Sequence, residues 1–276
     1  MKLFLETKDF SVSGEDFKLL HDPEMDMLVT DPQPKNLSPY YQSSSYISHT
    51  DSNKSLTDKL YQGVKRFSLL SKTMLINKYV NGNKTLLDVG AGTGDFLLTA
   101  RNNGFQVMGV EPNLDARLRS REKKMELLSN LDDLPKSKYK VITMWHVLEH
   151  LPDLDDQIKK LKSFLEEDGA LVVAVPNFKS FDAEHYKEFW AAYDVPRHLW
   201  HFSAKAIESI FAKHDMQLVK KKPMWFDSFY VSLLSEKYKT GQQNFLKAFY
   251  IGLRSNLMGL LTREFSSCIY VLKRNN

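Results

Sequence analysis

The chain has 276 residues, 42% hydrophobic and 26% charged, so it is long and apolar enough to bury a full core. Its formal net charge of +4 is too small to argue for nucleic acid as a partner, since acidic and basic residues are interspersed throughout. The single cysteine, Cys268, excludes an internal disulfide, and no signal-peptide core or run of roughly 20 apolar residues is present, so we expect a soluble, cytoplasmic protein.

Residues 1–51 differ from the rest of the chain. Four prolines, Pro23, Pro32, Pro34 and Pro39, interrupt short alternating stretches, which predicts two or three short strands in an irregular arm without a core of its own. An aromatic and serine-rich tract follows at 40–46. Its tyrosines either line the substrate side of a site or cover an exposed edge of the core.

Residues 56–80 carry apolar side chains at close to helical spacing, which predicts one or two amphipathic helices before a turn at 81–83. The next stretch, 85–101, organises the whole chain. A short apolar run ends at Val89, three glycines follow at alternate positions, and residues 95–101 have a helical pattern. Strand, glycine turn and helix begin a βαβ unit that binds a nucleotide-like ligand.

Two acidic residues indicate which ligand this is. Asp95 stands where a dinucleotide fingerprint has its third glycine, and a carboxylate in the first helical turn disfavours a pyrophosphate but suits a cationic ligand. Glu111 follows Asp88 by 23 residues, at the end of the next apolar strand, where an acid accepts the ribose hydroxyls. S-adenosylmethionine is cationic and carries no phosphate.

These residues resemble the first two motifs of the class I S-adenosylmethionine-dependent methyltransferases, at 87–94 and 110–112. The resemblance implies an α/β, Rossmann-like, seven-stranded and mostly parallel sheet with an antiparallel last strand and helices on both faces. It also implies a cofactor site and an adenine-binding acid at Asp132 rather than Asp133. The implied cofactor-binding residues are Asp88, Gly90, Ala91, Gly92, Gly94, Glu111, Pro112, Asp132, Trp145 and His146.

The second informative stretch is 140–152, a predicted buried strand followed by Trp145, His146 and a Leu-Glu-His segment. This segment resembles the small-molecule methyltransferases, including the ubiquinone-biosynthesis O-methyltransferases. A helix is predicted over 154–167, with Gly169 as its cap, and a buried strand over 170–177. In the family the end of that strand also faces the pocket.

Residues 180–203 form an aromatic loop with one arginine and two histidines, and similar segments recur in the same subgroup. Arg197 either holds a substrate carboxylate or phosphate or pairs with Asp194. Ser203 is a predicted N-cap for a helix over 204–214.

The rest of the chain predicts a strand at 216–222, helices at 225–239 and 244–261, and a closing antiparallel strand at 268–272. The second helix places six large apolar residues on one face. We expect residues 224–266 to form a helical cap over the substrate, although a homodimer or an apolar partner would use the same faces. The six residues are Leu246, Phe249, Tyr250, Leu253, Leu257 and Leu261.

Methyl transfer needs alignment, exclusion of water and often a base. Imidazole titrates in the right range, so the candidate catalytic residues, in order, are His150, His198, His201 and His146. A metal site is the alternative, because His146, Glu149 and His150 could share one face of a turn and bind an ion with His198 or His201. The small-RNA 2′-O-methyltransferases hold a metal with a similar cluster, but with an acid where His146 stands.

The sequence therefore predicts an N-terminal arm at 1–51 and a methyltransferase domain at 52–276. Many relatives carry a zinc ribbon in the arm, but this sequence lacks its cysteines. Aromatic loops suit an aromatic, partly apolar or sugar-like small molecule or a glycan precursor. We expect methylation of an oxygen, with nitrogen and carbon as the alternatives. The rival functions are an RNA or protein methyltransferase and a catalytically silent protein that binds the cofactor.

Overall fold

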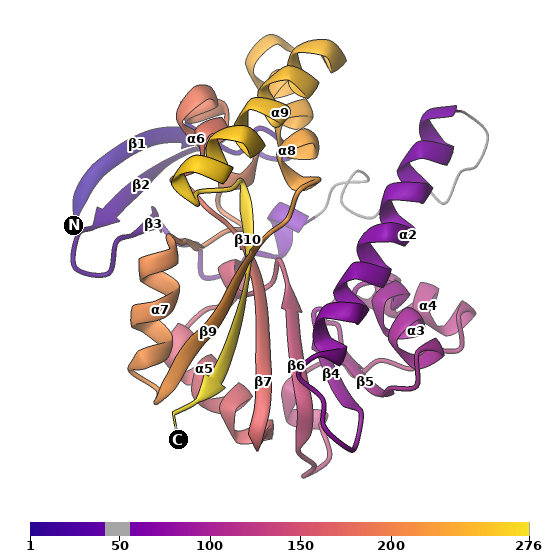
Figure 1. Cartoon of the computed structure of the whole chain (residues 1–276). Coiled ribbons are helices and arrows are strands. Elements are labelled where there is room, and N and C mark those ends of the chain that lie inside the picture. Colours follow the sequence, from indigo (N-terminus) through magenta and orange to yellow (C-terminus); the bar gives the residue numbers. More distant parts are fainter. Residues whose placement is uncertain (42–55, 276) are drawn as a thin grey trace. The chain divides into compact units, whose positions relative to one another are not determined.

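The computed structural model describes residues 1–41 and 56–275, with side chains from residue 62 onward in the second range (Figure 1). Contacts divide the chain into two compact units. Unit 1 comprises Met1–Ser43, His146–Asp155 and Ala174–Tyr270, and unit 2 comprises Ser44–Trp145, Asp156–Val173 and Val271–Asn276. Much of the predicted serine-rich tract, residues 42–46, lies outside the described residues, and the predicted boundary near residue 51 stays a prediction.

The predicted parallel strands are present. β4 (Thr85–Val89) pairs in parallel with β5 (Gln106–Val110) and with β6 (Tyr139–Trp145). Leu86 and Leu87 of β4 have no exposed surface, as expected for a strand covered on both faces. The strand order in the described sheet is β5-β4-β6-β7-β10-β9, with β7 at Leu165–Pro176, β9 at Met216–Pro223 and β10 at Ser267–Arg274 (Figure 1).

The last strand runs antiparallel to its neighbours, as predicted. Asn177, just after β7, donates its backbone N–H to the carbonyl of Ser266, just before β10. At the other end, the Arg274 guanidinium donates to the carbonyl of Leu165, where β7 begins. Met224, which follows β9, likewise donates to the carbonyl of Ser267. In each pair the end of one strand lies beside the start of the other.

The predicted sheet has seven strands, but beyond β5 the structure has only a single parallel bridge between Val110 and Leu128. Leu128 N donates to Gly109 O, and Glu111 N donates to Leu128 O. The chain then leaves the sheet, because the Asn130 side chain accepts two backbone N–H groups and starts a 3₁₀ turn at Leu131–Asp133. The described sheet consequently has six strands and this bridge.

Four α-helices precede β7, and three of them, α2, α3 and α5, lie at predicted positions, but the predicted glycine cap of α5 is absent. Gly169 lies inside β7 instead of ending a helix, because the helix stops at Phe164. A Cβ at this position would come within 2.8 Å of Leu165 Cδ1. The four are α2 (Leu56–Asn77), α3 (Asp95–Asn102), α4 (Leu114–Glu122) and α5 (Leu154–Phe164).

The N-terminal strands form a small antiparallel sheet in unit 1, in the order β1-β2-β3-β8, with β1 at Lys2–Lys8, β2 at Asp16–Asp22, β3 at Met27–Asp31 and β8 at Trp200–His201. Phe17, Leu19 and Leu28 of this sheet share a buried cluster with Tyr186 and Trp190. The three short strands are as predicted, and their apolar side chains belong to the core of unit 1.

The remaining helices lie mostly in the last third of the chain. Ser203 caps α7 (Ala204–Ala212) as predicted, because its side-chain hydroxyl accepts the backbone N–H of Ala206. In α9 the packed face is made of small residues, and Gly252 lies so close to α8 that a Cβ would sit 2.9 Å from Phe229 Cα. The six large apolar residues expected to pack on one face are all exposed. The bounds are η1 (Ser38–Tyr41), α6 (Phe181–Tyr186), α7 (Ala204–Ala212), α8 (Asp227–Thr240) and α9 (Phe245–Thr262).

No helix among residues 1–41 and 56–275 is both long enough and apolar enough to cross a membrane.

Candidate functional site

The glycine loop, residues 90–94, connects β4 to α3 in unit 2. Gly90 and Ala91 both donate their backbone N–H to Val110 O, at 2.8 and 3.0 Å, which ties the loop to the end of β5. Gly92 and Gly94 have φ of +53° and +76°, a region that glycine enters without steric cost. A Cβ on Gly92 would meet nothing within 4 Å, so the backbone here borders open space.

The side chain of Glu111 is hydrogen-bonded to the glycine loop. Its carboxylate accepts the Gly92 N–H at 2.8 Å through one oxygen and the Asn113 N–H at 2.9 Å through the other. The side chain is 92% buried, and Pro112 follows it. Each carboxylate oxygen keeps a second lone pair, so both can still accept a ligand hydroxyl. The predicted position of Glu111 at the end of the second strand is what brings it to the glycine loop.

Asp88 lies beneath the loop. It is 1% exposed, and Thr143 of β6 donates its hydroxyl to the carboxyl at 2.5 Å. Burial raises the pKa of Asp88 to about 7. The structure therefore gives Asp88 a bond between two strands, with no free surface for a ligand.

Asp95 is already neutralised within unit 2. Lys123 and Lys65 reach its carboxylate at 2.6 and 2.9 Å. Although burial opposes the effect, these ammonium groups lower the pKa of Asp95. The expectation that Asp95 offers a cationic ligand an unpaired negative charge is therefore wrong, because two lysines distant in sequence supply the compensating charge.

Asp132 and Trp145 complete the predicted cofactor residues of unit 2. Asp132 is largely exposed at the start of its 3₁₀ turn, where Lys160 donates to it at 2.6 Å. The Trp145 ring lies edge-on to Phe96, with Lys72 Nζ 4.3 Å from its centroid. Its indole N–H is buried and has no acceptor within the described part of the chain.

His146 opens unit 1, directly after β6, with a φ of +59°. Its Nε2 bonds Asp227 Oδ2 at 2.9 Å, and its Nδ1 lies 3.3 Å from Glu149 Oε1. Burial opposes protonation, but these two carboxylates raise the pKa of His146 to about 10. His146 is therefore a cation at neutral pH, without a lone pair for a proton or a metal. Nothing in the local sequence pattern indicated its partner Asp227.

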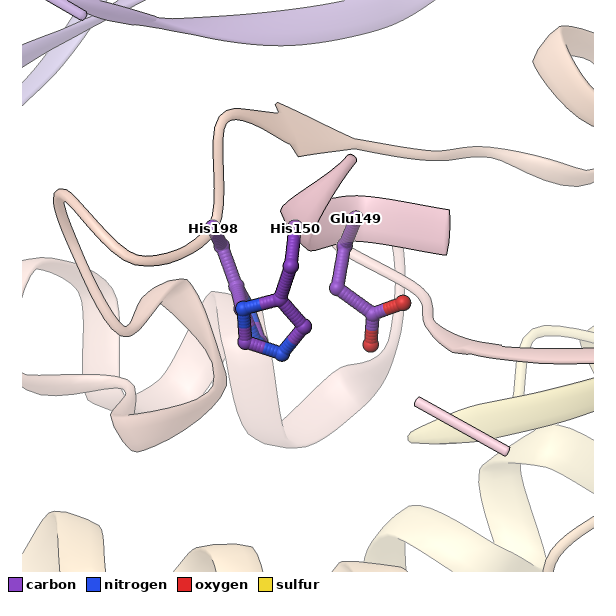
Figure 2. Close-up of side chains that lie close together, drawn as sticks. All are labelled: Glu149, His150 and His198. Atoms are coloured by element: carbon purple, nitrogen blue, oxygen red, sulfur yellow. The ribbon is translucent and has the colours of Figure 1, made fainter. Parts of the chain in front are cut away.

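Three other predicted residues, Glu149, His150 and His198, come together in what we call the Glu-His-His cluster (Figure 2). Glu149 and His150 come from the 3₁₀ turn at Leu148–His150, and His198 comes from the loop before β8. One possible ligand atom from each lies within 4.8 Å of the others. Figure 2 shows the His150 ring beside the Glu149 carboxylate.

His201 stands outside this cluster. Thr30 donates its single hydroxyl hydrogen to His198 O at 2.6 Å, so the Thr30 oxygen accepts from His201 Nε2 at 3.0 Å. Burial lowers the pKa of His201 well below its ordinary value. The residue thus links β3 to β8, which makes it a poor candidate for the base or for a metal ligand.

Arg197 is buried and holds two carboxylates, Asp194 at 2.7 Å and Asp9 at 2.9 Å. The predicted pairing with Asp194 is confirmed, and the guanidinium has no surface left for a substrate carboxylate. Asp9 was not predicted, because 188 residues separate it from Arg197.

Two of the aromatic residues expected to face a substrate are core residues instead. Tyr186 is fully buried, and Trp190 is 2% exposed and donates its indole N–H to Asp182 at 2.8 Å. Trp225 and Tyr230 of the predicted cap are about half exposed, at 44% and 53%.

Comparison with known proteins places this chain. Residues 59–221, more than half of the chain, match a family described as a methyltransferase domain. A ubiquinone biosynthesis O-methyltransferase from Glaesserella parasuis is 30% identical over 118 residues, covering 37% of this chain; the chain spans about half the length of that relative.

Solved structures of low sequence identity share the fold. Magnesium protoporphyrin IX methyltransferase from Synechocystis PCC 6803, solved with bound SAH, is 14% identical with a TM-score of 0.56, covering 86% of this chain and 97% of that one. A SAM-dependent methyltransferase from Archaeoglobus fulgidus is 17% identical with a TM-score of 0.52, covering 80% of this chain and 100% of that one. The chain therefore belongs to the methyltransferase domain family and has the Rossmann-like fold of the class I S-adenosylmethionine-dependent methyltransferases.

Proposed function

We propose that this protein transfers the methyl group of S-adenosylmethionine to an oxygen atom of a small molecule. The observation that carries the proposal is the Glu111 carboxylate, held at the N–H of Gly92 by a 2.8 Å hydrogen bond. A carboxylate at the end of the second strand is suited to accept the two ribose hydroxyls of the cofactor, beside backbone that has open space in front of it.

The reaction is an in-line displacement, in which the acceptor oxygen forms a bond to the methyl carbon as the carbon–sulfur bond breaks. The electron pair of the carbon–sulfur bond passes to sulfur, so the sulfonium becomes the neutral thioether of S-adenosylhomocysteine, which is the leaving group. The protein has to orient the two reactants and exclude water, and for a hydroxyl acceptor it has to assist removal of a proton.

We assign this proton removal to the Glu-His-His cluster. Burial and the neighbouring His198 lower the pKa of His150 to about 4, so its ring is neutral at pH 7, but it is a weaker base than free imidazole. His150 and His198 each use Nδ1 to bond a backbone carbonyl, which leaves Nε2 as the acceptor. His146 is protonated and His201 is engaged with Thr30, so the four histidine candidates reduce to two.

Oxygen is favoured over nitrogen or carbon as the methylated atom because hydroxyl acceptors need a base, and because the partly matching relative is an O-methyltransferase. The substrate class, a small molecule with an aromatic, apolar or sugar-like part, is supported by the small-molecule acceptors that such relatives' names give.

The test is conversion of S-adenosylmethionine to S-adenosylhomocysteine over a panel of phenols, catechols and sugar hydroxyls, with product mass measured. We expect one methyl group per molecule of S-adenosylhomocysteine formed. Methylation of RNA or protein alone, or tight cofactor binding without turnover on any acceptor class, would overturn the proposal.

A further inference from the structure

We propose that Glu149, His150 and His198 bind one divalent transition-metal ion. The three side chains contribute one carboxylate oxygen and two imidazole nitrogens, all within 4.8 Å of one another (Figure 2). Two histidines and one carboxylate are the protein ligands of many catalytic zinc and iron sites, which leave further positions open for water or substrate.

The Glu149 carboxylate is the first observation. The residue is 1% exposed, and within the described part of the chain neither carboxylate oxygen has a hydrogen-bond partner. His146 Nδ1 forms an ion pair with Oε1 at 3.3 Å, and the same imidazole is also paired with Asp227. A buried carboxylate without hydrogen bonds is costly, and the ion pair with His146 engages Oε1 alone, so a cation in the cluster would satisfy the other oxygen.

The orientation of the two imidazoles is the second, independent observation. His150 Nδ1 bonds Arg197 O at 3.0 Å, and His198 Nδ1 bonds Ala192 O at 2.9 Å. A carbonyl can only accept, so Nδ1 carries a proton in both rings, and Nε2 of each ring is the nitrogen that a metal ion would bind. Metal-binding histidines are commonly fixed in this way by a hydrogen bond from their other nitrogen.

The geometry requires a modest closure. A tetrahedral ion with bonds near 2.1 Å holds its ligands about 3.4 Å apart, so atoms separated by up to 4.8 Å must approach by up to about 1.4 Å. Asp194 Oδ2 is 4.0 Å from His198 Nε2, but its two oxygens already accept from Arg197. His201 is excluded, because its Nε2 donates to Thr30.

The role of the ion rests on the proposed function. An acceptor hydroxyl in an open coordination position would lose its proton to water more readily, since a bound cation lowers the pKa of coordinated oxygen. The O–H bond then breaks, the oxygen forms its bond to the methyl carbon, and the carbon–sulfur bond breaks as before. With the ion bound, His150 and His198 act as ligands rather than as direct bases.

The experiment is calorimetric titration of the chelator-stripped full chain with ZnCl₂ and MnCl₂. Metal content and the visible absorption of the Co²⁺ form are measured alongside. We compare wild type with Glu149→Gln, which keeps the shape and removes the charge, and with His198→Asn. The matched control is His214→Asn, because His214 is equally buried but pairs with Asp155 at 2.8 Å away from the cluster.

We expect one ion per wild-type chain, affinity at least about 100-fold weaker in Glu149→Gln and His198→Asn, and wild-type affinity in the control. Binding of S-adenosylmethionine and the melting temperature report whether each variant is folded. A folded wild type that binds no ion, or cluster variants that bind it as wild type does, would overturn the site.

The metal site and the proposed function fail separately. Methyl transfer that persists in the chelator-stripped, metal-free chain overturns the catalytic role of the ion and leaves the proposed function standing. Stoichiometric, Glu149-dependent metal binding without methyl transfer to any acceptor supports the site and overturns the function.

Discussion

Replacing Glu111 by alanine removes the residue that we assign to the ribose. In the free protein, Gly92 and Asn113 lose their carboxylate partner, and each hydrogen bond to a charged group contributes about 1.5–3 kcal/mol. Water replaces part of this, so we expect the free energy of unfolding to fall by about 2–3 kcal/mol. With cofactor, two hydroxyl contacts worth together about 3 kcal/mol disappear, which raises the Kd for S-adenosylmethionine on the order of 100-fold.

Calorimetric titration with S-adenosylmethionine and a urea unfolding curve measure the two effects. Glu111→Gln keeps one acceptor oxygen and the shape of the side chain, so we expect a loss of affinity near tenfold. Glu126→Ala, an exposed glutamate in the same unit, serves as the control and should change neither value. If Glu111→Ala binds the cofactor within about twofold of wild type, the assignment of this carboxylate is wrong.

Three further changes test the fold around the sites. Gly92→Ala should cost about 1–2 kcal/mol of stability because φ is +53°, and its Cβ enters the space assigned to the cofactor, so calorimetry should show affinity lowered at least about tenfold. Unaltered affinity would place the cofactor elsewhere. Asp88 binds a proton in the native state up to about pH 7 but in the unfolded chain only to about pH 4, so stability falls as pH rises between these values, by up to about 4 kcal/mol. Urea unfolding measured across this pH range should show the decrease of the unfolding free energy in wild type and not in Asp88→Asn. An equal decrease in both proteins refutes the raised pKa of Asp88. Arg197→Met leaves Asp9 buried without a cation and should lower the unfolding free energy by about 3–5 kcal/mol. A second change, Asp9→Asn, should restore part of this stability. No loss of stability in the single variant contradicts the buried pairing.

The positions of the glycine loop and of Glu111 could be predicted from the sequence because their signals are local. The alternate glycines and Glu111 sit at strand ends, and parallel strands bring their carboxyl ends to one edge of the sheet. Ser203 as a cap was equally predictable, since a cap acts within one turn. The predicted helical cap and the domain boundary stay predictions.

The roles of the candidate histidines could not be predicted from the sequence, because each role depends on partners that are distant along the chain. Asp227 makes His146 a cation, and Thr30 engages His201. The expectation that Asp95 offers its charge to a cationic ligand failed for the same reason, because the sequence does not show that Lys65 and Lys123 are its partners.

Helix α9 shows a second reason why the sequence could not predict the whole structure. Its apolar periodicity was real, but periodicity alone does not say which face packs. The close approach of Gly252 to Phe229 selects the small-residue face, and the large apolar residues are left exposed. A spacing of small residues at 248, 252, 255 and 259 was the available signal.

The most direct test of the central claim is a calorimetric comparison of ligands on the wild-type chain. We predict that S-adenosylmethionine and S-adenosylhomocysteine each bind with a stoichiometry of one and that NAD gives no binding heat. Binding of NAD together with no response to either adenosyl compound would contradict the account.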